Sequence, residues 1–250
     1  MKSLRFSLII AAGLSLAGLP ATAQVNVVFG TTWDSPTNTL QNILDARYGA
    51  GNVDVANGYI GKAAADPDPF TWTGLSFNSI LVREVAGHAN NNILGWYKET
   101  GAMPAIDGTD DGIVFTGPMG PGSIEMVSFG PGESSFGFYL NPNGTGNATN
   151  APEPELFFTN RLFNDLGPNG SGAVHSPFDG DVQALIFDVS ALTQPNTWVV
   201  AFEDLDSGPN PTPCCSQTDN DFNDLVFEVT VARAVGVEQV AISAFKSLYK

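Results

Sequence analysis

Four side chains with metal-ligating oxygens crowd into one short stretch of the chain: Asp219, Asp221, Asn223 and Asp224. Carboxylates and amide carbonyls are the ligands that hard divalent cations prefer. The apolar run that follows them predicts a strand, and an earlier apolar run ends in a second acidic group, Glu203 and Asp204. Two strand ends that both carry carboxylates indicate a site for a hard cation.

The order of these segments predicts how the two acidic groups meet. We expect consecutive strands over Trp198–Glu203 and Phe222–Val231. Consecutive strands usually pair, and a loop connection makes them antiparallel, so the end of the first lies beside the start of the second. The predicted metal ligands are therefore Glu203, Asp204, Asp219, Asp221, Asn223 and Asp224. The connecting loop adds one more carboxylate, Asp206.

Calcium is the cation that this set of oxygens suits best. Clustered carboxylates raise each other's pKa and destabilise a fold unless a cation lies between them. Calcium takes six to eight oxygen ligands, whereas magnesium requires a tighter octahedron and ranks second. Zinc or copper would require His or Cys ligands, and the two histidines, His88 and His175, have no metal-ligand spacing.

The acidic stretch is not an EF-hand. Asp219, Asp221 and Asn223 match the first three ligand positions of that loop. Asp224 stands where the loop needs Gly, and Thr230 stands where it needs Glu. A cation site here must be built on strands. The alternative is that Asp and Asn gather at strand ends only because they favour turns.

The remaining sequence predicts an all-β fold, a β-sandwich of the jelly-roll kind. Short apolar runs alternate with turn residues throughout the chain. We expect strands over Val25–Phe29, Ser79–Val85, Ile93–Tyr97, Gly112–Phe115, Ile124–Phe129, Ser135–Leu140, Glu155–Thr159 and Val182–Val189, in addition to the two that bear the acidic groups. Strand spacing of this kind favours a sandwich or a barrel.

One N-terminal helix interrupts the strand pattern. Leu40, Leu44 and Tyr48 recur at helical spacing and Gly49 follows as a stop signal, so the helix should cap one end or face of the sandwich. Residues 233–250 have helical spacing and a basic end. They predict either a short C-terminal helix packed on the sandwich or a sorting or docking tail.

At the acidic segments the chain resembles a known family. Ala201–Asp204, followed after a loop by Asp219–Phe227, is similar to the signature of the domain of unknown function 4114. Two further segments are similar to other parts of that family: Ser135–Leu140 to the start of the domain, and Glu84–Asn92, followed by Gly95–Tyr97, to an element upstream of it. The resemblance covers roughly residues 80–232.

This resemblance implies a β-rich extracellular domain that binds calcium. The family occurs in secreted and surface-associated bacterial proteins, and no enzymatic activity is established for it. Many relatives end in a Pro-Glu-Pro sorting tail with a hydrophobic helix and a basic end. This chain lacks that tail, so the resemblance does not extend to anchoring by that route.

The N-terminal residues 1–23 have the pattern of a cleaved export signal. Lys2 and Arg5 precede the apolar stretch Leu8–Leu19, and Ala21–Ala23 fits the small-x-small cleavage pattern. The alternative, a membrane anchor, needs about 20 apolar residues, and no other segment is long and apolar enough to span a membrane. We expect a secreted or cell-surface protein, with residues 24–232 as a single sandwich domain.

The net charge and the cysteine content limit which classes of binding partner and which disulfides the sequence predicts. The formal net charge is −16, and loss of Lys2 and Arg5 with the signal would make it −18. A chain this acidic should repel nucleic acid and anionic membrane surfaces and attract cations.

The only cysteines, Cys214 and Cys215, are adjacent. They predict no disulfide framework, and a strained bridge, an intermolecular link and free thiols stay open.

Three function classes follow from these features. The first is a calcium-binding module with a structural, adhesive or surface-binding role toward glycans or cell-surface components. The second is a lectin-like module in which Trp33, Trp72 or Trp96 stacks on sugars, although a Trp in a sandwich is more often part of the core. The third is a polysaccharide or peptide hydrolase that uses two of the carboxylates. No residue is predicted to be catalytic.

Overall fold

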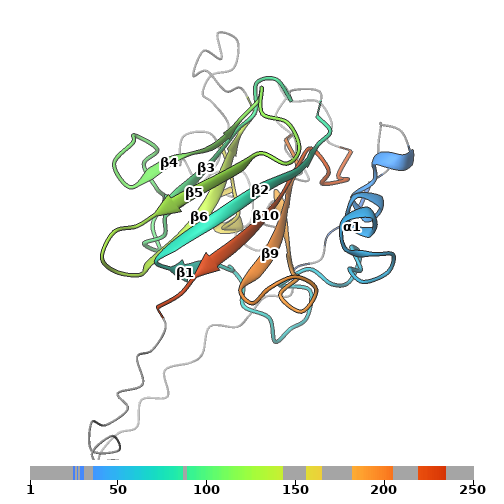
Figure 1. Ribbon diagram of the computed structural model, residues 1–250, viewed down its shortest axis with the longest axis horizontal. Coiled ribbons are helices and arrows are strands. Elements are labelled where there is room, and N and C mark those ends of the chain that lie inside the picture. The colour runs from blue at the N-terminus through green and yellow to red at the C-terminus, as the bar shows by residue number, and fades with distance from the viewer. Residues whose placement is uncertain are drawn as a thin grey trace, which may run out of the picture.

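The computed structural model describes residues 25, 27, 29–30, 36–86, 89–142, 156–164, 182–204 and 219–234. Within these ranges, ten strands form two antiparallel sheets that pack face to face (Figure 1), which confirms the all-β sandwich. Several predicted features lie outside the described residues: the export signal, Trp33, both histidines, Asp206, the cysteine pair and the C-terminal helix from residue 235 onward.

The strands divide equally between the two sheets. The first sheet contains β1 (Trp72–Gly74), β3 (Ile93–Lys98), β4 (Asp111–Thr116), β6 (Ser134–Asn141) and β7 (Phe157–Phe158). The second contains β2 (Ser76–Glu84), β5 (Ile124–Ser128), β8 (Ala184–Asp188), β9 (Thr197–Phe202) and β10 (Leu225–Ala232). The helical segments are η1 (Pro36–Asn38), α1 (Leu40–Tyr48) and α2 (Arg161–Asn164).

The sheet topology brings distant segments together. The second sheet has the order β5-β2-β10-β9-β8, so the long strand β2 pairs with the last strand, β10. The first sheet has the order β1-β6-β3-β4, and β7 also pairs with β6. The end of β2 therefore lies beside the start of β10, with Glu84 opposite Leu225.

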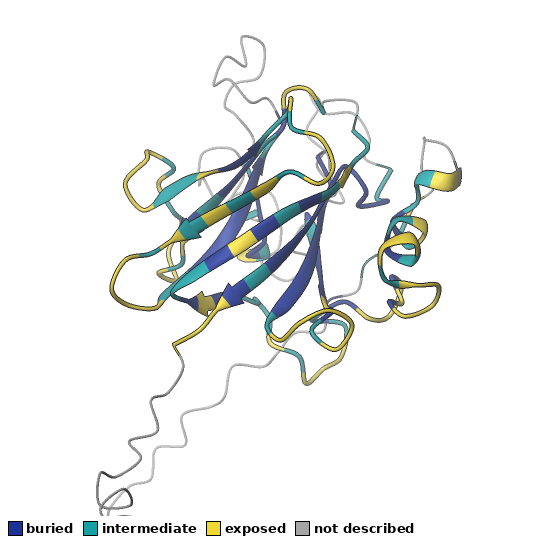
Figure 2. Cartoon of the chain, viewed as in Figure 1, coloured by how far each residue is buried: buried dark blue, intermediate teal, exposed yellow. Residues whose placement is uncertain are grey.

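Two hydrophobic layers cover the second sheet. Trp198, Val200 and Phe202 of β9 face the first sheet and join the main core between the sheets. Val199 and Ala201 point the other way, into a second cluster with residues of α1 and the segment that follows it. Successive side chains of a strand point to opposite faces, so β9 is buried along its whole length (Figure 2).

Helix α1 forms where the sequence predicts it and covers the outer face of the second sheet. Thr39 caps it by accepting a hydrogen bond from the Asn42 backbone N–H at 3.2 Å. It ends at Gly49, whose φ of 94° is in the region that favours glycine. Leu40 and Leu44 are buried against the sheet, so the helix covers a face of the sandwich.

The end of this helix is tied to the last strand. The Tyr48 hydroxyl donates to Glu228 of β10 at 2.6 Å, and an Arg47 guanidinium nitrogen lies 3.2 Å from the same carboxylate oxygen. Glu228 is buried, so these partners satisfy a charge that would otherwise be costly to enclose.

The first predicted strand is wrong. None of its described residues, Val25, Val27 and Phe29, is in a strand. The Val25 N–H instead donates to the Gly61 carbonyl, and the Tyr59 hydroxyl contacts both Val25 and Val27. Tertiary contacts with the segment after α1 therefore satisfy the described polar groups of Val25 and the Val27 N–H without a strand partner.

One other predicted element is corrected, and two observed elements were missed. The last strand begins at Leu225 rather than Phe222, because Phe222 has a φ of 56°, which no strand residue adopts. The short strand β1 and the helix α2 were not predicted. Elements of three or four residues are too short to show a periodicity.

The tryptophans proposed for sugar stacking are mostly in the core. Trp72 is 1% exposed and contacts the rings of Phe70, Phe136 and Phe138. Trp96 is partly buried and packs edge-on against Phe129 with the ring centroids 5.0 Å apart. Trp72 therefore offers no free ring face to a sugar, and Trp96 is partly covered. No helix in the described ranges is long and apolar enough to cross a bilayer.

Phe138 lies at the centre of the aromatic core, where its ring contacts Trp72, Phe77 and Phe227. We expect Phe138→Ala to lower the free energy of unfolding by about 3–5 kcal/mol, because it removes a buried ring and leaves a cavity. Denaturant unfolding measures this loss. The control Met126→Ala, at a side chain that is 68% exposed, should change stability by less than about 0.5 kcal/mol. Equal losses in both variants would contradict the assignment of the core.

Candidate metal centre

The two acidic groups meet at one end of the second sheet. β9 and β10 pair in antiparallel fashion, and their last pair joins Phe202 to Leu225. Glu203 and Asp204 directly follow β9, and Asp224 directly precedes β10. The expected arrangement of these strands is therefore confirmed, and all six predicted ligands lie at this end of the sheet.

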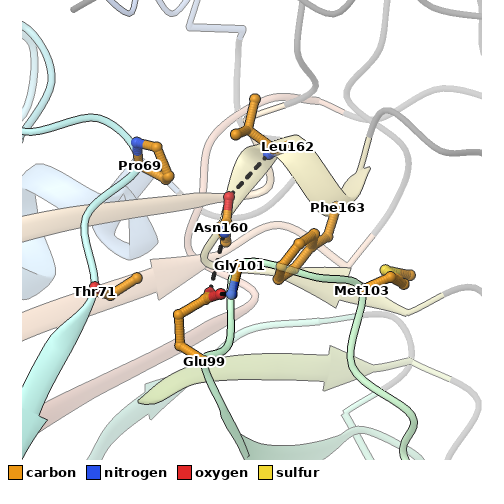
Figure 3. Close-up of a pocket in the computed structure, with 8 residues that line it drawn as sticks. All are labelled: Pro69, Thr71, Glu99, Gly101, Met103, Asn160, Leu162 and Phe163. Atoms are coloured by element: carbon orange, nitrogen blue, oxygen red, sulfur yellow. Dashed lines mark hydrogen bonds between the residues drawn. The ribbon is translucent and has the colours of Figure 1, made fainter. Parts of the chain in front are cut away.

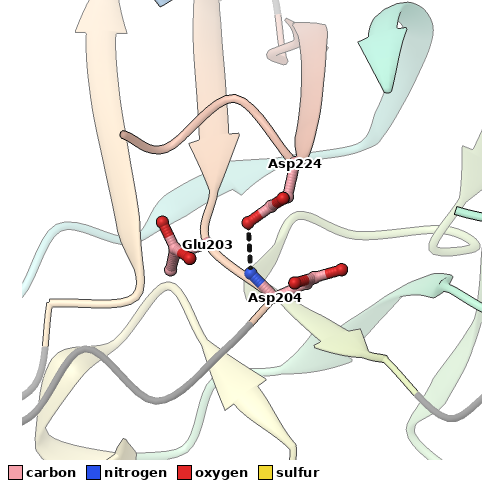
Figure 4. A group of neighbouring side chains, drawn as sticks. All are labelled: Glu203, Asp204 and Asp224. Carbon is pink, nitrogen blue, oxygen red and sulfur yellow. Dashed lines mark hydrogen bonds between the residues drawn. The ribbon is translucent and has the colours of Figure 1, made fainter. Parts of the chain in front are cut away.

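The carboxylates form two overlapping groups. The inner group consists of Glu203, Asp204 and Asp224, and the outer group consists of Glu203, Asp219 and Asp221. Within each group, one oxygen from every carboxylate lies within 4.8 Å of the others. Figure 4 shows the inner group at the ends of β9 and β10. Glu203 belongs to both groups, so it links them.

Most of these carboxylates are shielded from solvent. Glu203 is 1% exposed and Asp204 is 3% exposed, while Asp221 and Asp224 are 8% and 7% exposed. Asp219 is the most accessible of the five. Two unit charges 4 Å apart repel each other by about 4 kcal/mol at the effective dielectric constant of a protein surface. Burial on this scale is therefore unfavourable for five ionised carboxylates on their own.

An irregular backbone segment positions the carboxylates of the outer group that precede β10. Asn220 and Phe222 have positive φ values of 51° and 56°. This conformation is strained for a bulky residue such as Phe222. The ring of Phe222 is buried in the second hydrophobic cluster, under α1, where its centroid lies 6.0 Å from that of Phe29. The Phe222 backbone N–H donates to Glu203 at 3.3 Å. Ring burial thus holds the backbone on either side of Phe222.

Asn223 connects the outer group to the N-terminal part of the chain. Its Nδ2 donates to Asp221 at 2.6 Å and to the Asn38 carbonyl at 2.9 Å. The Gly30 N–H donates to the Asn220 carbonyl at 3.1 Å. A Cβ at Gly30 would collide with the carbonyl oxygen of Asp219, so only glycine allows this close approach.

The inner group has two neighbours that were not predicted as ligands. Asn92, which immediately precedes β3, donates from Nδ2 to Asp204 at 3.5 Å. Glu84 ends β2, and the next residue, Val85, donates its N–H to the Asp224 carbonyl at 3.1 Å. The resemblance of Glu84–Asn92 to an upstream family element was the only sequence signal. Only the pairing of β2 with β10 places that segment beside the acidic groups.

Burial and like charges shift two pKa values at this site. Burial, followed by the charges of Glu203 and Asp204, raises the pKa of Asp224 well above its usual range. The N–H of Asp204, which donates to Asp224 at 2.8 Å, opposes this shift. Burial, with a smaller contribution from Asp204, raises the pKa of Glu84 to about 7. Both raised pKa values mean that a negative charge at these positions is less favourable than it is in water.

A cavity of about 440 Å³ lies at a different place in the fold, beside α2 (Figure 3). Among the described residues that line it, Glu99 is the only carboxylate. The Glu99 carboxylate accepts hydrogen bonds from Asn160 and from the Gly101 N–H at 3.1 and 2.7 Å. A glycosidase needs two carboxylates that flank the scissile bond. The described lining of this cavity therefore supplies one carboxylate and not a pair.

Comparison with protein families agrees with the resemblance seen in the sequence. Residues 129–232 match the family model named Domain of unknown function (DUF4114). The match begins near the end of β5 and contains all six predicted ligands. Glu84 and Asn92 lie before it, so the upstream part of the resemblance, before residue 129, is not part of the match. No curated protein and no solved structure matches the chain.

The raised pKa values predict that stability without divalent cations depends on pH. Protonated Glu84 has no charge to desolvate, so the folded state binds this proton more tightly than the unfolded chain does. In chelator, we therefore expect the free energy of unfolding to fall as pH rises from about 4.5 to about 7. Asp224 adds a dependence of the same sign. Denaturant unfolding at a series of pH values measures the slope.

Glu84→Gln should reduce this slope, because glutamine does not titrate. Glu125→Gln in β5 is the matched control and should keep the wild-type slope, since Glu125 is not part of the acidic site. An unchanged slope in Glu84→Gln would show that the pH dependence arises elsewhere.

Proposed function

We propose that this chain is an exported calcium-binding β-sandwich with a structural, adhesive or surface-binding role. The observation that carries the proposal is the convergence of five mostly buried carboxylates on the paired ends of β9 and β10. The end of β9 and the segment before β10 both contribute to this place, so a cation bound there joins them.

Several features of the site favour calcium. The ligand atoms are all oxygens, and an amide side chain, Asn223, lies among the carboxylates. Calcium–oxygen distances of 2.3–2.6 Å place ligands on opposite sides of the ion about 5 Å apart. The carboxylate oxygens of each group lie within 4.8 Å of one another. Magnesium usually keeps several water ligands in a rigid octahedron, so a set of oxygens supplied by the protein suits it less.

The site supports binding and stability rather than catalysis. The inner group is enclosed, and Asp204 and Asp224 are already tied together by a backbone hydrogen bond. Burial, and then repulsion by Glu203 and Asp204, raise the pKa of Asp224. A cation there would offset the repulsion, and so would stabilise the folded state by mass action. The export pattern of residues 1–23 and the acidity of the chain agree with a module that works where calcium is abundant. Calcium-binding modules outside cells have dissociation constants of about 0.1–1 mM.

The alternatives have less support. A lectin-like groove would need exposed aromatic rings, and Trp72 and Trp96 are core or core-packed. A polysaccharide hydrolase would need two carboxylates in an open cleft, and the described residues that line the cavity beside α2 supply one. Contact with glycans or cell-surface components through other parts of the surface remains part of the proposed role.

We expect calcium to raise the thermal midpoint of the protein. At a calcium concentration 100 times the dissociation constant, binding adds about 2.7 kcal/mol to the free energy of unfolding, or roughly 5–10 °C for a domain of this size. A thermal melt with calcium and with chelator measures the shift, and calorimetry measures the heat of binding. No shift and no heat would contradict the proposal.

Asp224→Asn and Asp221→Asn should each remove most of the calcium-dependent shift. Asp224→Asn should also raise the midpoint in chelator, because it removes a buried charge and keeps an oxygen for the Asp204 N–H. Asp188→Asn makes the same charge change at the opposite end of the same sheet and should keep the full shift. Retained affinity in both site variants would show that the ligands lie elsewhere.

A further inference from the structure

The cavity of about 440 Å³ beside α2 shares no lining residue with the acidic groups. Its described lining comes from three segments that are far apart in the sequence: the one before β1, the one after β3, and the one around α2 (Figure 3). Pockets that bind small ligands commonly have volumes of about 300–1,000 Å³. This cavity is therefore large enough for a small organic ligand or a protein side chain.

Buried contacts hold the walls of the cavity in place. Arg161 of α2 pairs with Asp68, the neighbour of the lining residue Pro69, through Nη2 and Nε contacts of 2.7 and 2.8 Å. These two side chains are 12% and 8% exposed. The Asn164 side chain exchanges hydrogen bonds with the backbone of Phe158 at 2.7 and 3.0 Å. The wall around α2 is thus fixed to the first sheet and to the segment before β1.

One carboxylate, that of Glu99, lies in the described lining of this cavity. Its Oε2 atom accepts hydrogen bonds from Asn160 at 3.1 Å and from the Tyr97 hydroxyl at 3.5 Å, while Oε1 accepts one from the Gly101 N–H at 2.7 Å. A carboxylate has about four acceptor positions, so Oε1 keeps one for a ligand. Glu99 forms no ion pair with a basic side chain in the described part of the chain.

Exposed apolar side chains accompany this carboxylate. Met103 and Leu162 line the cavity, and each is 41% exposed. They are two of the six large apolar side chains that are exposed among the described residues. Pro69 adds apolar surface from the segment before β1. Apolar surface that gathers at a hollow with a few polar groups is typical of a ligand site, and the ligand that fits has a positive group and an apolar part.

We propose that this cavity binds an alkylammonium group, with the ammonium on Glu99 and the apolar chain against Met103 and Leu162. An ammonium group donates three hydrogen bonds and accepts none, so it suits the free acceptor position of Oε1 and supplies the positive partner that the carboxylate lacks. Hydrogen bonds between charged groups are about twice as strong as those between neutral groups. The net charge of −16 also attracts cations to this protein.

The same geometry disfavours other ligand classes. A guanidinium group binds a carboxylate best as a planar fork on both oxygens, and Oε2 of Glu99 already accepts from Asn160 and Tyr97. Glu99 would repel an anionic ligand, and a neutral ligand would leave its charge without a partner. Alkylammonium groups have two sources, a free amine and the lysine side chain of a protein partner.

Calorimetric titration of the purified full-length protein with hexylammonium chloride tests the proposal. We expect saturable binding at one site. Hexanol and hexanoate have the same chain without the positive charge, so they should bind at least about tenfold more weakly. No binding of hexylammonium, or equal binding of hexanol, would overturn the proposal.

Substitutions then locate the bound group. Glu99→Gln removes the charge and keeps an acceptor for the Gly101 N–H, and it should weaken hexylammonium by at least about tenfold. Met103→Ser changes only an exposed side chain and should weaken it several-fold. Glu125→Gln in β5, outside the lining, is the control and should keep wild-type affinity. Circular dichroism verifies that each variant is folded. Wild-type affinity in both Glu99→Gln and Met103→Ser would place the binding elsewhere and overturn the proposal.

A third titration distinguishes the two sources of the ammonium group. Nα-acetyllysine methylamide represents a lysine side chain of a protein partner, and the corresponding arginine compound is its control. Tighter binding of the lysine compound than of hexylammonium assigns the cavity to a protein partner, and the reverse assigns it to a free amine; both results support the proposal. Binding of the arginine compound as tight as that of the lysine compound would overturn the preference for ammonium.

Discussion

The antiparallel pairing of β9 with β10 is the constraint on which the acidic site depends. It places Phe202 opposite Leu225, so Glu203, Asp204 and Asp224 must share one end of the sheet. Burial, and then the charges of Glu203 and Asp204, raise the pKa of Asp224, so this arrangement is unfavourable for ionised carboxylates. The hydrophobic side chains of the two strands, which are buried on both faces, hold it in place. The hydrophobic core of the sandwich thus offsets the unfavourable burial of the carboxylates.

The two cores have different relations to this site. The core between the sheets holds the strand ends together through residues such as Phe202 and Leu225. The second hydrophobic cluster, under α1, holds the irregular segment before β10, because the ring of Phe222 is part of that cluster. The strained conformation of Phe222 is tolerated because its ring is buried and its N–H reaches Glu203. Both layers of packing therefore fix the positions of oxygens that could bind a cation.

The family match covers only part of the residues that the structure brings together at the acidic site. Residues 129–232 contain both acidic strand ends, but β2 and the segment before β3 lie outside the match. The structure nevertheless brings Glu84 and Asn92 to the same place, through the pairing of β2 with β10 and a hydrogen bond to Asp204. The acidic end of this protein is thus made by matched and unmatched parts of the chain together.

The sequence by itself determined the all-β class, most of the strands, the helix over Leu40–Tyr48 and the six candidate ligands. These features are local: alternation, helical spacing and acidic residues at strand ends can be read within a few residues. The pairing of β9 with β10 also followed, because neighbouring strands joined by a loop usually pair. The first expected strand failed because tertiary contacts with the segment after the helix satisfy the described polar groups of Val25 and the Val27 N–H.

Only the tertiary structure decided the rest. It divided the carboxylates into two groups around Glu203, through a backbone turn at Asn220 and Phe222 that no sequence pattern signals. It also brought Asn92 against Asp204, although more than a hundred residues separate them. Contacts of this range depend on strand order in the sheets and on which ring is buried in which core. These are properties of the whole packed chain, and local spacing does not contain them.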